Sequence, residues 1–490
     1  MIAVDAPILL EGLTVERLAG RPVAVLGFAR SGLALARFLA DAGAVVTVYD
    51  RLPAAELAAR VAALEGRPVR LLLGPEVDPR VALAGQALVC TSPSVSSRFP
   101  TTEPGLRAAL AALEAEGRVP VASEIDLFLR LCPAATVGVT GTKGKTTVAS
   151  LCAAVLERGE RRAWLGGNIG VPLIERVTAM TAGDLVVLEI SELQIPTLSR
   201  GTDIAVYTNV TADHLDRHGS LAAYRAVKAR LAALTAARGG LLVLNDDDPF
   251  VAGLEPGARA RRYRLGPPPA GGVGIAGDPA WIVADGAGAI MPRAELPLPG
   301  EHNVRNVLAA VAVGVEHGIA PEAIRAAVAA FPGVEHRLET VAVVAGIRYV
   351  NDSQGTQPDA VIAALRAFPR PLVLIAGGRD KGVDLAPLAA VAARRADAAV
   401  LIGESAPRLG ALFEAAGLAV VERAPTLRDA VRRATGLARA ALAAGATPPA
   451  TVLLSPAAAS FDMFEDYAAR GRAFKAEVAE LVAETGGDGS

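Results

Sequence analysis

One short segment limits the fold of this chain more than any other part of its sequence. An apolar stretch that begins near Ala134 is predicted to be a strand, and it leads through a glycine-rich turn directly into a predicted helix. Glycines in such a turn let backbone N–H groups converge, and the start of the helix favours an anion. A strand, a turn and a helix in this order are typical of parallel sheets with helices on their faces.

The turn itself predicts a site for a nucleoside triphosphate. Lys145 has the length to reach the β- and γ-phosphate oxygens, and the Thr146 hydroxyl can ligate Mg²⁺. The usual spacing of such a loop has glycine where Val139 stands, so this loop is a compact variant. The candidate ATP-binding residues of the loop are Gly141, Thr142, Lys143, Gly144, Lys145, Thr146 and Thr147.

Two further stretches of the 490-residue chain show the same alternation of strand and helix, and at roughly 150 residues per domain the length favours three domains. The first stretch predicts a helix from about Ser31 and a strand ending at Asp50. Its Gly27 and Gly32 lack the middle glycine of a dinucleotide fingerprint, because Ala29 stands there. Gly27 and Gly32 could still form part of a crevice that binds a mononucleotide, or they could serve only the turn and its packing.

A Gly- and Pro-rich stretch at 267–290 predicts short strands joined by turns.

The composition excludes several classes of protein. The formal net charge of −2 gives no electrostatic footprint for a nucleic acid. No apolar run reaches the ~18 residues of a membrane-spanning helix, and the acidic start is unlike a signal peptide. The three cysteines are too scattered for a disulfide framework or a zinc site. We therefore expect a cytoplasmic enzyme or nucleotide-binding protein, with neither nucleic acid nor membrane as a partner.

Lysine is rare in this chain, since only five of its 49 basic residues are lysines. A retained lysine suggests a need for a primary amine, because the guanidinium of arginine neither deprotonates nor reacts readily. Two of the five lie in the glycine-rich loop, and Lys228 and Lys381 are candidates for other chemistry. Lys475, on the predicted final helix, is expected to be an ordinary surface residue.

Two segments after the loop supply candidate metal ligands. DLVVLEISELQ is predicted to be a buried strand whose end presents Glu189, well placed for Mg²⁺, although an acid at a strand end can also be structural. The next strand leads to His214 and to a helix from about Ser220. On this helix Lys228 falls on the inward arc together with Tyr224.

A lysine on an inward arc has two interpretations. Burying an ammonium costs desolvation energy, so the side chain either snorkels towards water or has a lowered pKa. In the second case the neutral amine of Lys228 can add CO₂, and the resulting carbamate can serve as a carboxylate-like ligand for a second Mg²⁺ near His214. Arginine cannot do this.

With these motifs in place, the chain resembles the Mur ligases, the ATP-dependent amide-forming enzymes of peptidoglycan precursor synthesis, almost from end to end. Besides the loop, GGNIG around Asn168 is similar to their substrate segment, TNVTADHLDRH with YRAVK to their magnesium-binding stretch, and HNVRN to their adenine segment. The resemblance implies an α/β protein with three domains. These are a Rossmann-like UDP-substrate-binding domain over 1–133, a central P-loop ATPase domain with a mainly parallel sheet over 134–331, and a Rossmann-like glutamate-binding domain over 332–490.

Within the family, the chain is most similar to the members that add D-glutamate. The Asn-Asp-Ser segment at 351–353 and the patterns GGRDKG and LLSPAAASFDMFEDYAARG resemble their third domain, and no histidine follows His336. The resemblance implies that glutamate is bound by Thr356, Lys381, Ser460 and Tyr467. It implies a UDP-substrate site at Arg30, Ser31, Asp50, Arg51, Ser92 and Asn168, and further ATP contacts at Asn303, Asn306, Arg337 and Asp352.

The implied reaction activates the carboxylate of UDP-N-acetylmuramoyl-L-alanine with ATP and joins it to glutamate through an acyl phosphate. The implied catalytic residues are Lys145, Glu189, His214 and Lys228. Thr146 and Glu189 are assigned to a first Mg²⁺, and His214 with carbamylated Lys228 to a second. The expected ligands are therefore ATP, two Mg²⁺ ions and the two small-molecule substrates, bound by a monomer in the cytoplasm.

Alternative activities stay open. Glu192 stands where the family usually has serine, Ser94 where it has glycine, and Gln354 where it often has lysine, so L-glutamate or another amino acid remains an alternative substrate. A nucleotide switch would bind ATP without ligation, but it has no need of Lys381 and Ser460. A nicotinamide dehydrogenase is disfavoured by the missing middle glycine and the separate ATP loop.

Overall fold

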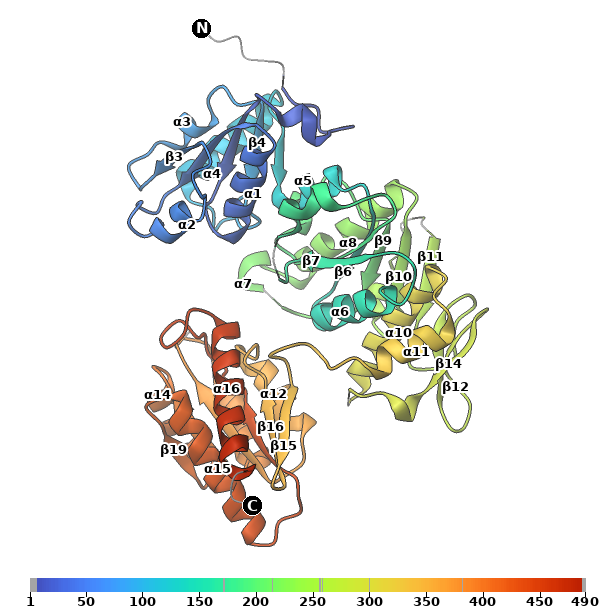
Figure 1. Cartoon of the computed structure of the whole chain (residues 1–490), viewed down its shortest axis with the longest axis vertical. Helices are drawn as coiled ribbons and strands as arrows, with labels where there is room; N and C mark the ends of the chain where they lie inside the picture. The colour runs from blue at the N-terminus through green and yellow to red at the C-terminus, as the bar shows by residue number, and fades with distance from the viewer. Residues whose placement is uncertain are drawn as a thin grey trace. The chain divides into compact units, whose positions relative to one another are not determined.

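The computed structural model describes residues 7–170, 172–213, 215–254, 257, 259–298, 300–380 and 382–486. The chain forms two compact units, with the boundary between Phe331 and Pro332. Within the described residues the strands form three sheets, two in the first unit and one in the second, and helices flank each sheet (Figure 1). This is the α/β architecture that the alternation of strand and helix predicts.

The first sheet is parallel and has the order β3-β2-β1-β4-β5, which is the order of a doubly wound sheet. A turn at Gly27 and a helix follow its first strand, as the sequence predicts. Its strands are β1 (Pro22–Leu26), β2 (Val45–Asp50), β3 (Val69–Leu73), β4 (Leu88–Thr91) and β5 (Val121–Ser123). The helices here are η1 (Val15–Leu18), α1 (Arg30–Asp41), α2 (Ala58–Ala62), α3 (Pro79–Leu83), α4 (Pro104–Glu116) and α5 (Glu124–Leu131).

The second sheet has the order β14-β13-β12-β11-β10-β9-β6-β8-β7. It is parallel from β7 to β12, whereas β12, β13 and β14 pair antiparallel and form the short strands expected of the Gly- and Pro-rich stretch. Its strands are β6 (Ala135–Thr140), β7 (Ala163–Gly167), β8 (Leu185–Glu189), β9 (Ile204–Tyr207), β10 (Leu241–Asn245), β11 (Arg259–Tyr263), β12 (Val273–Ala276), β13 (Trp281–Ala284) and β14 (Gly288–Pro292).

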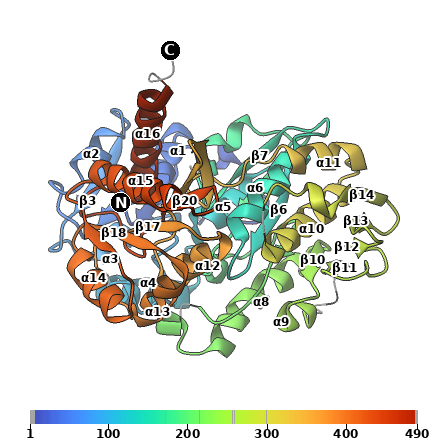
Figure 2. The ribbon, with the colours of Figure 1, turned by 90° about the horizontal axis from the view of Figure 1, so that it is seen from below.

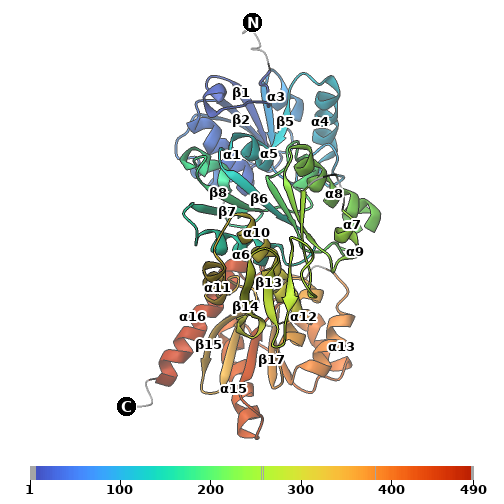
Figure 3. The same cartoon turned by 90° about the vertical axis from the view of Figure 1, so that its right-hand side faces the viewer.

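Helices of the second sheet bring separate segments of the chain to the glycine-rich loop. The long helices α6 and α10 pack side by side, and α8 packs against β9 and β10 (Figure 3). The helices are α6 (Lys145–Leu156), η2 (Leu173–Ala179), η3 (Ile195–Thr197), α7 (Leu215–His218), α8 (Leu221–Ala237), α9 (Pro249–Ala252), η4 (Arg293–Glu295), α10 (Glu301–Glu316) and α11 (Pro321–Ala329).

Helix α5 connects the first two sheets and joins their cores. The side chain of Ser123 accepts a hydrogen bond from the Asp126 N–H and caps the helix. Ile125 and Phe128 of this helix are buried in a core that also contains residues of both sheets. The carboxylate of Asp126 accepts hydrogen bonds from the backbone and hydroxyl of Ser199, so the helix is also fixed to the loop after η3.

The sheet of the second unit has the order β15-β16-β20-β17-β18-β19, and all of its pairs except β15–β16 are parallel. Helices α12, α13 and α14 cover one face, and α15 and α16 cover the other (Figure 2). The strands are β15 (Glu339–Val344), β16 (Ile347–Asn351), β17 (Leu372–Gly377), β18 (Ala398–Ile402), β19 (Val421–Arg423) and β20 (Ala450–Leu454). The helices are α12 (Pro358–Ala367), α13 (Ala386–Arg395), α14 (Ala406–Ala415), α15 (Leu427–Ala443) and α16 (Tyr467–Gly486).

None of the helices in the described part of the chain has the length and apolar character that a membrane span requires.

Candidate functional site

The glycine-rich loop lies between β6 and α6, because β6 ends at Thr140 and α6 begins at Lys145. Gly141 and Gly144 have φ angles of 146° and 85°, a region that strains any residue with a Cβ. A Cβ on Gly141 would lie 1.9 Å from Thr208 Oγ1, and one on Gly144 would lie 2.6 Å from Asn306 Oδ1. Glycine at these two positions therefore lets other segments approach the loop closely.

The end of β9 holds the backbone of this loop. Asn209 O accepts the Thr142 N–H at 2.7 Å, and Asn209 Oδ1 accepts the Lys143 N–H at 3.0 Å. The side chains of Asn209 and Thr208 both donate to Lys143 O, at 3.0 and 2.7 Å. The sequence does not single out Thr208 and Asn209 among the residues of TNVTADHLDRH; the available signal was a Thr-Asn pair at the end of the strand that follows Glu189.

Thr146, Glu189 and Asn168 lie together at the start of α6. The Thr146 hydroxyl donates to Glu189 Oε2 at 2.7 Å, and Asn168 Nδ2 donates to Glu189 Oε1 at 3.1 Å. Lys145 Nζ donates to Thr142 O at 2.9 Å, so its amine lies over the loop. The hydroxyl and carboxylate oxygens are hard donors of the kind that Mg²⁺ prefers, and they fit the first predicted ion. Among the described residues, no group of three or more His, Cys, Asp or Glu side chains is arranged to hold a metal.

Lys228 is fully buried on α8, as the helical wheel predicts, so the snorkelling interpretation is wrong. Its Nζ donates to Thr140 Oγ1 at 3.2 Å and lies 5.5 Å from the centroid of the Tyr224 ring. The Tyr224 hydroxyl is in turn 3.1 Å from Thr142 Oγ1. Burial, and next the charge of Lys145, lower the pKa of Lys228 to about 7. The neutral form of this amine is therefore more accessible than it is for an exposed lysine.

Further charged residues surround the loop on the side of α7. Lys143 Nζ pairs with Asp213 Oδ2 at 3.0 Å. Glu192 is buried, and its carboxylate lies 3.5 Å from Arg217 Nη1. His214, the predicted ligand of a second Mg²⁺, lies outside the described residues.

The predicted adenine segment lies in the first turns of α10. Asn306 is buried, and its Nδ2 donates to Asn303 Oδ1 at 3.1 Å. Because Asn306 also lies against Gly144, this segment and the glycine-rich loop are neighbours.

The predicted UDP-substrate residues of the first sheet gather at the carboxyl ends of β1, β2 and β4, where ligands of doubly wound sheets bind. Asp50 accepts the N–H groups of Phe28 and Leu52, at 2.7 and 2.9 Å, so its two oxygens order the turns after β1 and β2. Arg30 Nη1 donates to Gly170 O at 2.9 Å, which brings the Asn168 segment next to α1. The remaining candidates on this edge are Ser31, Arg51 and Ser92, of which Ser92 is buried and Arg51 is exposed.

In the second unit, the Asn-Asp-Ser segment and the segment 455–460 lie at one edge of the sheet. The strands β16 and β20 that precede them are parallel neighbours. Asp352 Oδ2 accepts the Ser455 hydroxyl at 2.6 Å, and Asp352 Oδ1 accepts the Leu338 N–H at 3.2 Å. Burial raises the pKa of Asp352 to about 6. This arrangement brings Thr356 and Ser460 to the same edge, whereas Lys381 lies outside the described residues.

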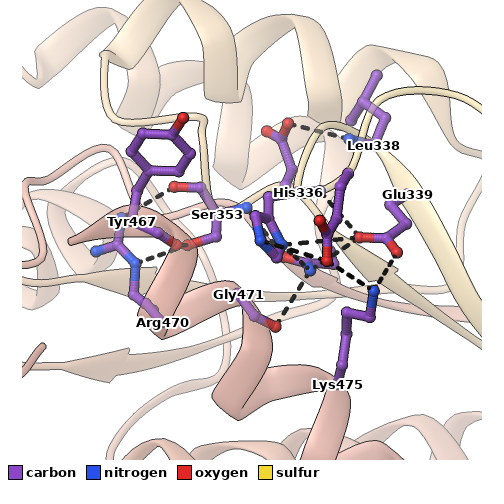
Figure 4. A network of polar contacts seen from close by, with 11 residues as sticks. His336, Leu338, Glu339, Ser353, Tyr467, Arg470, Gly471 and Lys475 are labelled. Carbon is purple, nitrogen blue, oxygen red and sulfur yellow. Dashed lines mark hydrogen bonds and ion pairs between the residues drawn. The ribbon is translucent and has the colours of Figure 1, made fainter. Parts of the chain in front are cut away.

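A buried arginine that was not predicted joins these two segments. Arg470 is 1% exposed, and its guanidinium donates to Ser353 Oγ and Ser353 O at 3.0 Å each (Figure 4). It also donates to Ala458 O at 3.3 Å and Ala459 O at 3.4 Å. Ser353 Oγ donates to the backbone oxygen of Tyr467, which places that predicted residue at the start of α16 beside the same edge. Burial lowers the pKa of Arg470 to about 10.

The candidate ATP residue Arg337 lies on a strained turn. Its neighbours His336 and Leu338 have φ angles of 63° and 46°, and such residues cost about 1–3 kcal/mol each unless their surroundings hold them. Lys475 Nζ donates to Glu335 Oε1 at 3.1 Å and to Glu339 Oε1 at 2.8 Å, one at each end of this turn. Lys475, which was expected to be an ordinary surface residue, is 35% exposed at its side chain and forms ion pairs with these two carboxylates.

Comparisons with known proteins place the chain in a family. Residues 139–314 match the family model of the Mur ligase middle domain, and residues 336–458 match that of the Mur ligase, glutamate ligase domain. A UDP-N-acetylmuramoylalanine–D-glutamate ligase of Symbiobacterium thermophilum is 38% identical over 466 residues, which cover 94% of this chain and 98% of the relative. A protein of the same name from Pelotomaculum thermopropionicum is 39% identical over 473 residues, with the same two coverages.

Solved structures share the fold at lower identity. The UDP-N-acetylmuramate–alanine ligase of Thermotoga maritima aligns with a TM-score of 0.58 and 19% identity, over 94% of this chain and 100% of that one. A pseudomurein peptide ligase type C from Methanothermus fervidus aligns with a TM-score of 0.54 and 17% identity over the same shares. Together with the relatives that match almost the whole chain, these similarities show that this chain is a member of the Mur ligase family.

Proposed function

We propose that this chain joins D-glutamate to UDP-N-acetylmuramoyl-L-alanine in an ATP-dependent step of peptidoglycan precursor synthesis. The observation that carries the proposal is the identity of 38% and 39% with two ligases of that name, over 94% of this chain. The glycine-rich loop and the contact of Thr146 with Glu189 support the use of ATP. We further propose that the chain acts as a monomer in the cytoplasm, as the resemblance implies.

The chemistry must first turn a carboxylate into an electrophile. An oxygen of the alanyl carboxylate attacks the γ-phosphorus of ATP, the bond to the bridging oxygen breaks, and ADP leaves with the electron pair. The amine of glutamate, after losing a proton, attacks the acyl carbon, and phosphate leaves as the amide forms. Lys145 and the N–H groups of residues 141–147 are placed at the start of α6, where they would offset the negative charge that two approaching anions bring together.

Magnesium fits the oxygen donors at the start of α6. Thr146 and Glu189 would hold one ion, and His214 with carbamylated Lys228 would hold a second. Bound Mg²⁺ would neutralise charge on the phosphate oxygens. The fully buried amine of Lys228, with its pKa lowered to about 7, supports carbamate formation, because only the neutral amine adds CO₂.

The presence of three sheets supports the assignment of one substrate to each of three domains. We assign the UDP-linked substrate to a domain over 1–133, at the edge with Arg30 and Asp50. ATP is assigned to a P-loop domain over 134–331. Glutamate is assigned to a domain over 332–490, at the edge with Thr356 and Ser460, with Tyr467 and Lys381 as further contacts.

The test of this function is phosphate release from ATP by the full chain. We expect release only when UDP-N-acetylmuramoyl-L-alanine and D-glutamate are both present, together with a product of the corresponding mass. L-glutamate, L-alanine and a diamino acid serve as the comparison substrates. Release that is the same without any amino acid would refute the ligase and support a nucleotide switch, and preference for another amino acid would correct the substrate.

A further inference from the structure

Lys143 of the glycine-rich loop is bound at each of its polar groups by one short segment of the chain, residues 208–213. Its N–H donates to Asn209 Oδ1 at 3.0 Å, and its carbonyl oxygen accepts hydrogen bonds from Thr208 Oγ1 at 2.7 Å and Asn209 Nδ2 at 3.0 Å. Its Nζ pairs with Asp213 Oδ2 at 3.0 Å. The Lys143 side chain is 58% exposed, so the ion pair, and not burial, holds its ammonium in this position.

The neighbouring Thr142 is bound by the same segment. Its N–H donates to Asn209 O at 2.7 Å, and its hydroxyl accepts the Thr211 N–H and donates to Thr211 O, at 3.1 Å each. The N–H groups of Thr142 and Lys143 are therefore both engaged within the protein. A phosphate could reach them only by breaking these hydrogen bonds.

The second half of the loop is open to an anion. Helix α6 begins at Lys145, its N-cap residue Gly144 is left-handed, and no side chain of the described residues caps it. N–H groups in the first turn of a helix have no partner within the helix, and with the helix dipole they favour an anion. Lys145 Nζ lies over the loop, 2.9 Å from Thr142 O. The groups that suit a phosphate therefore belong to residues 144–147.

A loop with this composition benefits from an anchor. Gly141 and Gly144 lie on either side of the Thr142–Lys143 pair, and both have positive φ. Glycine has more backbone freedom than any other residue, and a loop that becomes ordered only on binding loses that freedom at the expense of affinity. Contacts that hold the loop before the nucleotide arrives remove this loss.

We propose that Lys143 is a positioning residue of the ATP site, whose pairing with Asp213 holds the loop in the conformation that receives the phosphates. Lys145 and the N–H groups of residues 144–147 bind the phosphates themselves. The proposal rests on the proposed function, since it takes the glycine-rich loop as the ATP site. It gives the two lysines of one loop different roles. The competing arrangement is that Lys143 leaves Asp213 and binds a phosphate directly.

The experiment measures the Kd of an ATP analogue with a β,γ-methylene bridge, by calorimetry on the full chain in the presence of Mg²⁺. Lys143→Met should raise this Kd about fivefold, the size expected of a partly exposed ion pair. Asp213→Asn should raise it by a similar factor, although this variant removes a negative charge beside the loop. Direct phosphate binding requires the opposite sign, because Asp213→Asn frees the ammonium. A lower Kd in Asp213→Asn would therefore overturn the proposal.

Exchanging the two charges gives the decisive readout. The double variant Lys143→Asp with Asp213→Lys keeps the net charge and can form the ion pair in the opposite sense. We expect its Kd to return close to that of the wild type. A carboxylate at position 143 would repel a phosphate bound there, so a Kd at or above that of Lys143→Met would overturn the proposal.

Arg67→Met is the matched control. Arg67 pairs with Asp41 at 2.7 Å beside the first sheet, and its replacement also removes one positive charge from the same unit. Its Kd should equal that of the wild type. Hydrogen exchange of residues 141–147 in the nucleotide-free chain is the second readout, and it should be faster in Lys143→Met but not in Arg67→Met. Unchanged exchange in Lys143→Met would overturn the proposal.

The binding measurement also separates this inference from the proposed function. A wild-type chain that binds the analogue, with a Lys143→Met variant that binds it equally well, would refute this inference alone. A wild-type chain that does not bind the analogue would refute the use of ATP, and this inference with it.

Discussion

The Thr146 hydroxyl donates a hydrogen bond of 2.7 Å to Glu189 Oε2, although the two residues are 43 positions apart. The contact forms because β6, which precedes the loop, and β8, which ends at Glu189, are parallel neighbours whose carboxyl ends lie at one edge of the sheet. The other oxygen of Glu189 accepts Asn168 Nδ2 at 3.1 Å. One carboxylate therefore links the candidate ATP loop to the candidate substrate segment.

Glu189→Gln tests this carboxylate as a magnesium ligand. The amide oxygen can still accept from Thr146, but it carries no negative charge. We expect kcat to fall about 100-fold and the Mg²⁺ concentration for half-maximal rate to rise. Glu316→Gln is the control, because Glu316 lies at the far end of α10 and pairs with Arg259 and Arg261. Equal Mg²⁺ dependence of Glu189→Gln and wild type would contradict this assignment.

Gly144→Ala tests the close approach of α10 to the loop. The new Cβ would meet Asn306 Oδ1 at 2.6 Å in addition to the strain of a φ angle of 85°. We expect the KM for ATP to rise about tenfold or more. Gly117→Ala has a similar φ of 64° but no atom within 4 Å, so it should cost only about 1–2 kcal/mol of stability, with the KM unchanged. An unchanged KM in Gly144→Ala would show that the contact does not shape the ATP site.

Lys228→Arg tests whether a carbamate, and not a cation, is needed on α8. The charge is retained, but a guanidinium cannot add CO₂. We expect activity to fall about 100-fold or more while the protein remains folded. Because the larger side chain must also fit a fully buried position, Lys228→Ala supplies the second measurement, in which short carboxylates such as acetate or propionate should restore part of the activity. Full activity of Lys228→Arg would rule out the carbamate.

Glu124→Gln tests a buried acid that the proposed chemistry does not use. Burial raises the pKa of Glu124 to about 7 from an ordinary value of 4.5, although the charge of Arg30 opposes the rise. Between these pH values the folded protein binds more protons than the unfolded chain, so the free energy of unfolding falls as the pH rises from 4.5 to 7. The full shift corresponds to at most about 3 kcal/mol.

The variant should therefore match the wild type near pH 4.5 and be more stable than it at pH 8, by about 1–3 kcal/mol. Urea unfolding is followed by tryptophan fluorescence. This signal reports on the first unit, which contains Glu124 and both tryptophans, Trp164 and Trp281. Glu103→Gln should behave in the opposite way, since hydrogen bonds from the Gly105 and Leu106 N–H groups lower the pKa of that partly exposed acid. A difference for Glu124→Gln that is constant from pH 5 to pH 8 would contradict the assigned pKa.

The sequence by itself determined the features that depend on residues close together along the chain. The strand, glycine turn and helix around Gly141 follow from local pattern and from the φ angles that only glycine adopts freely. The inward position of Lys228 follows from the 3.6-residue period of its helix, which fixes the face of each side chain before any partner is known. The alternation of strands and helices is also a local pattern, and it was enough to predict an α/β fold.

Only the tertiary structure decided which distant residues complete these features. Asn209 holds the loop at Lys143 from 66 positions away, and Arg470 binds Ser353 across 117 positions. The pattern of α16 gives no sign that Lys475 pairs with Glu335 and Glu339, which lie 140 and 136 positions away along the chain. Periodicity specifies which face of an element is buried, but the neighbour on that face depends on strand order and packing, which bring residues together irrespective of their separation along the chain.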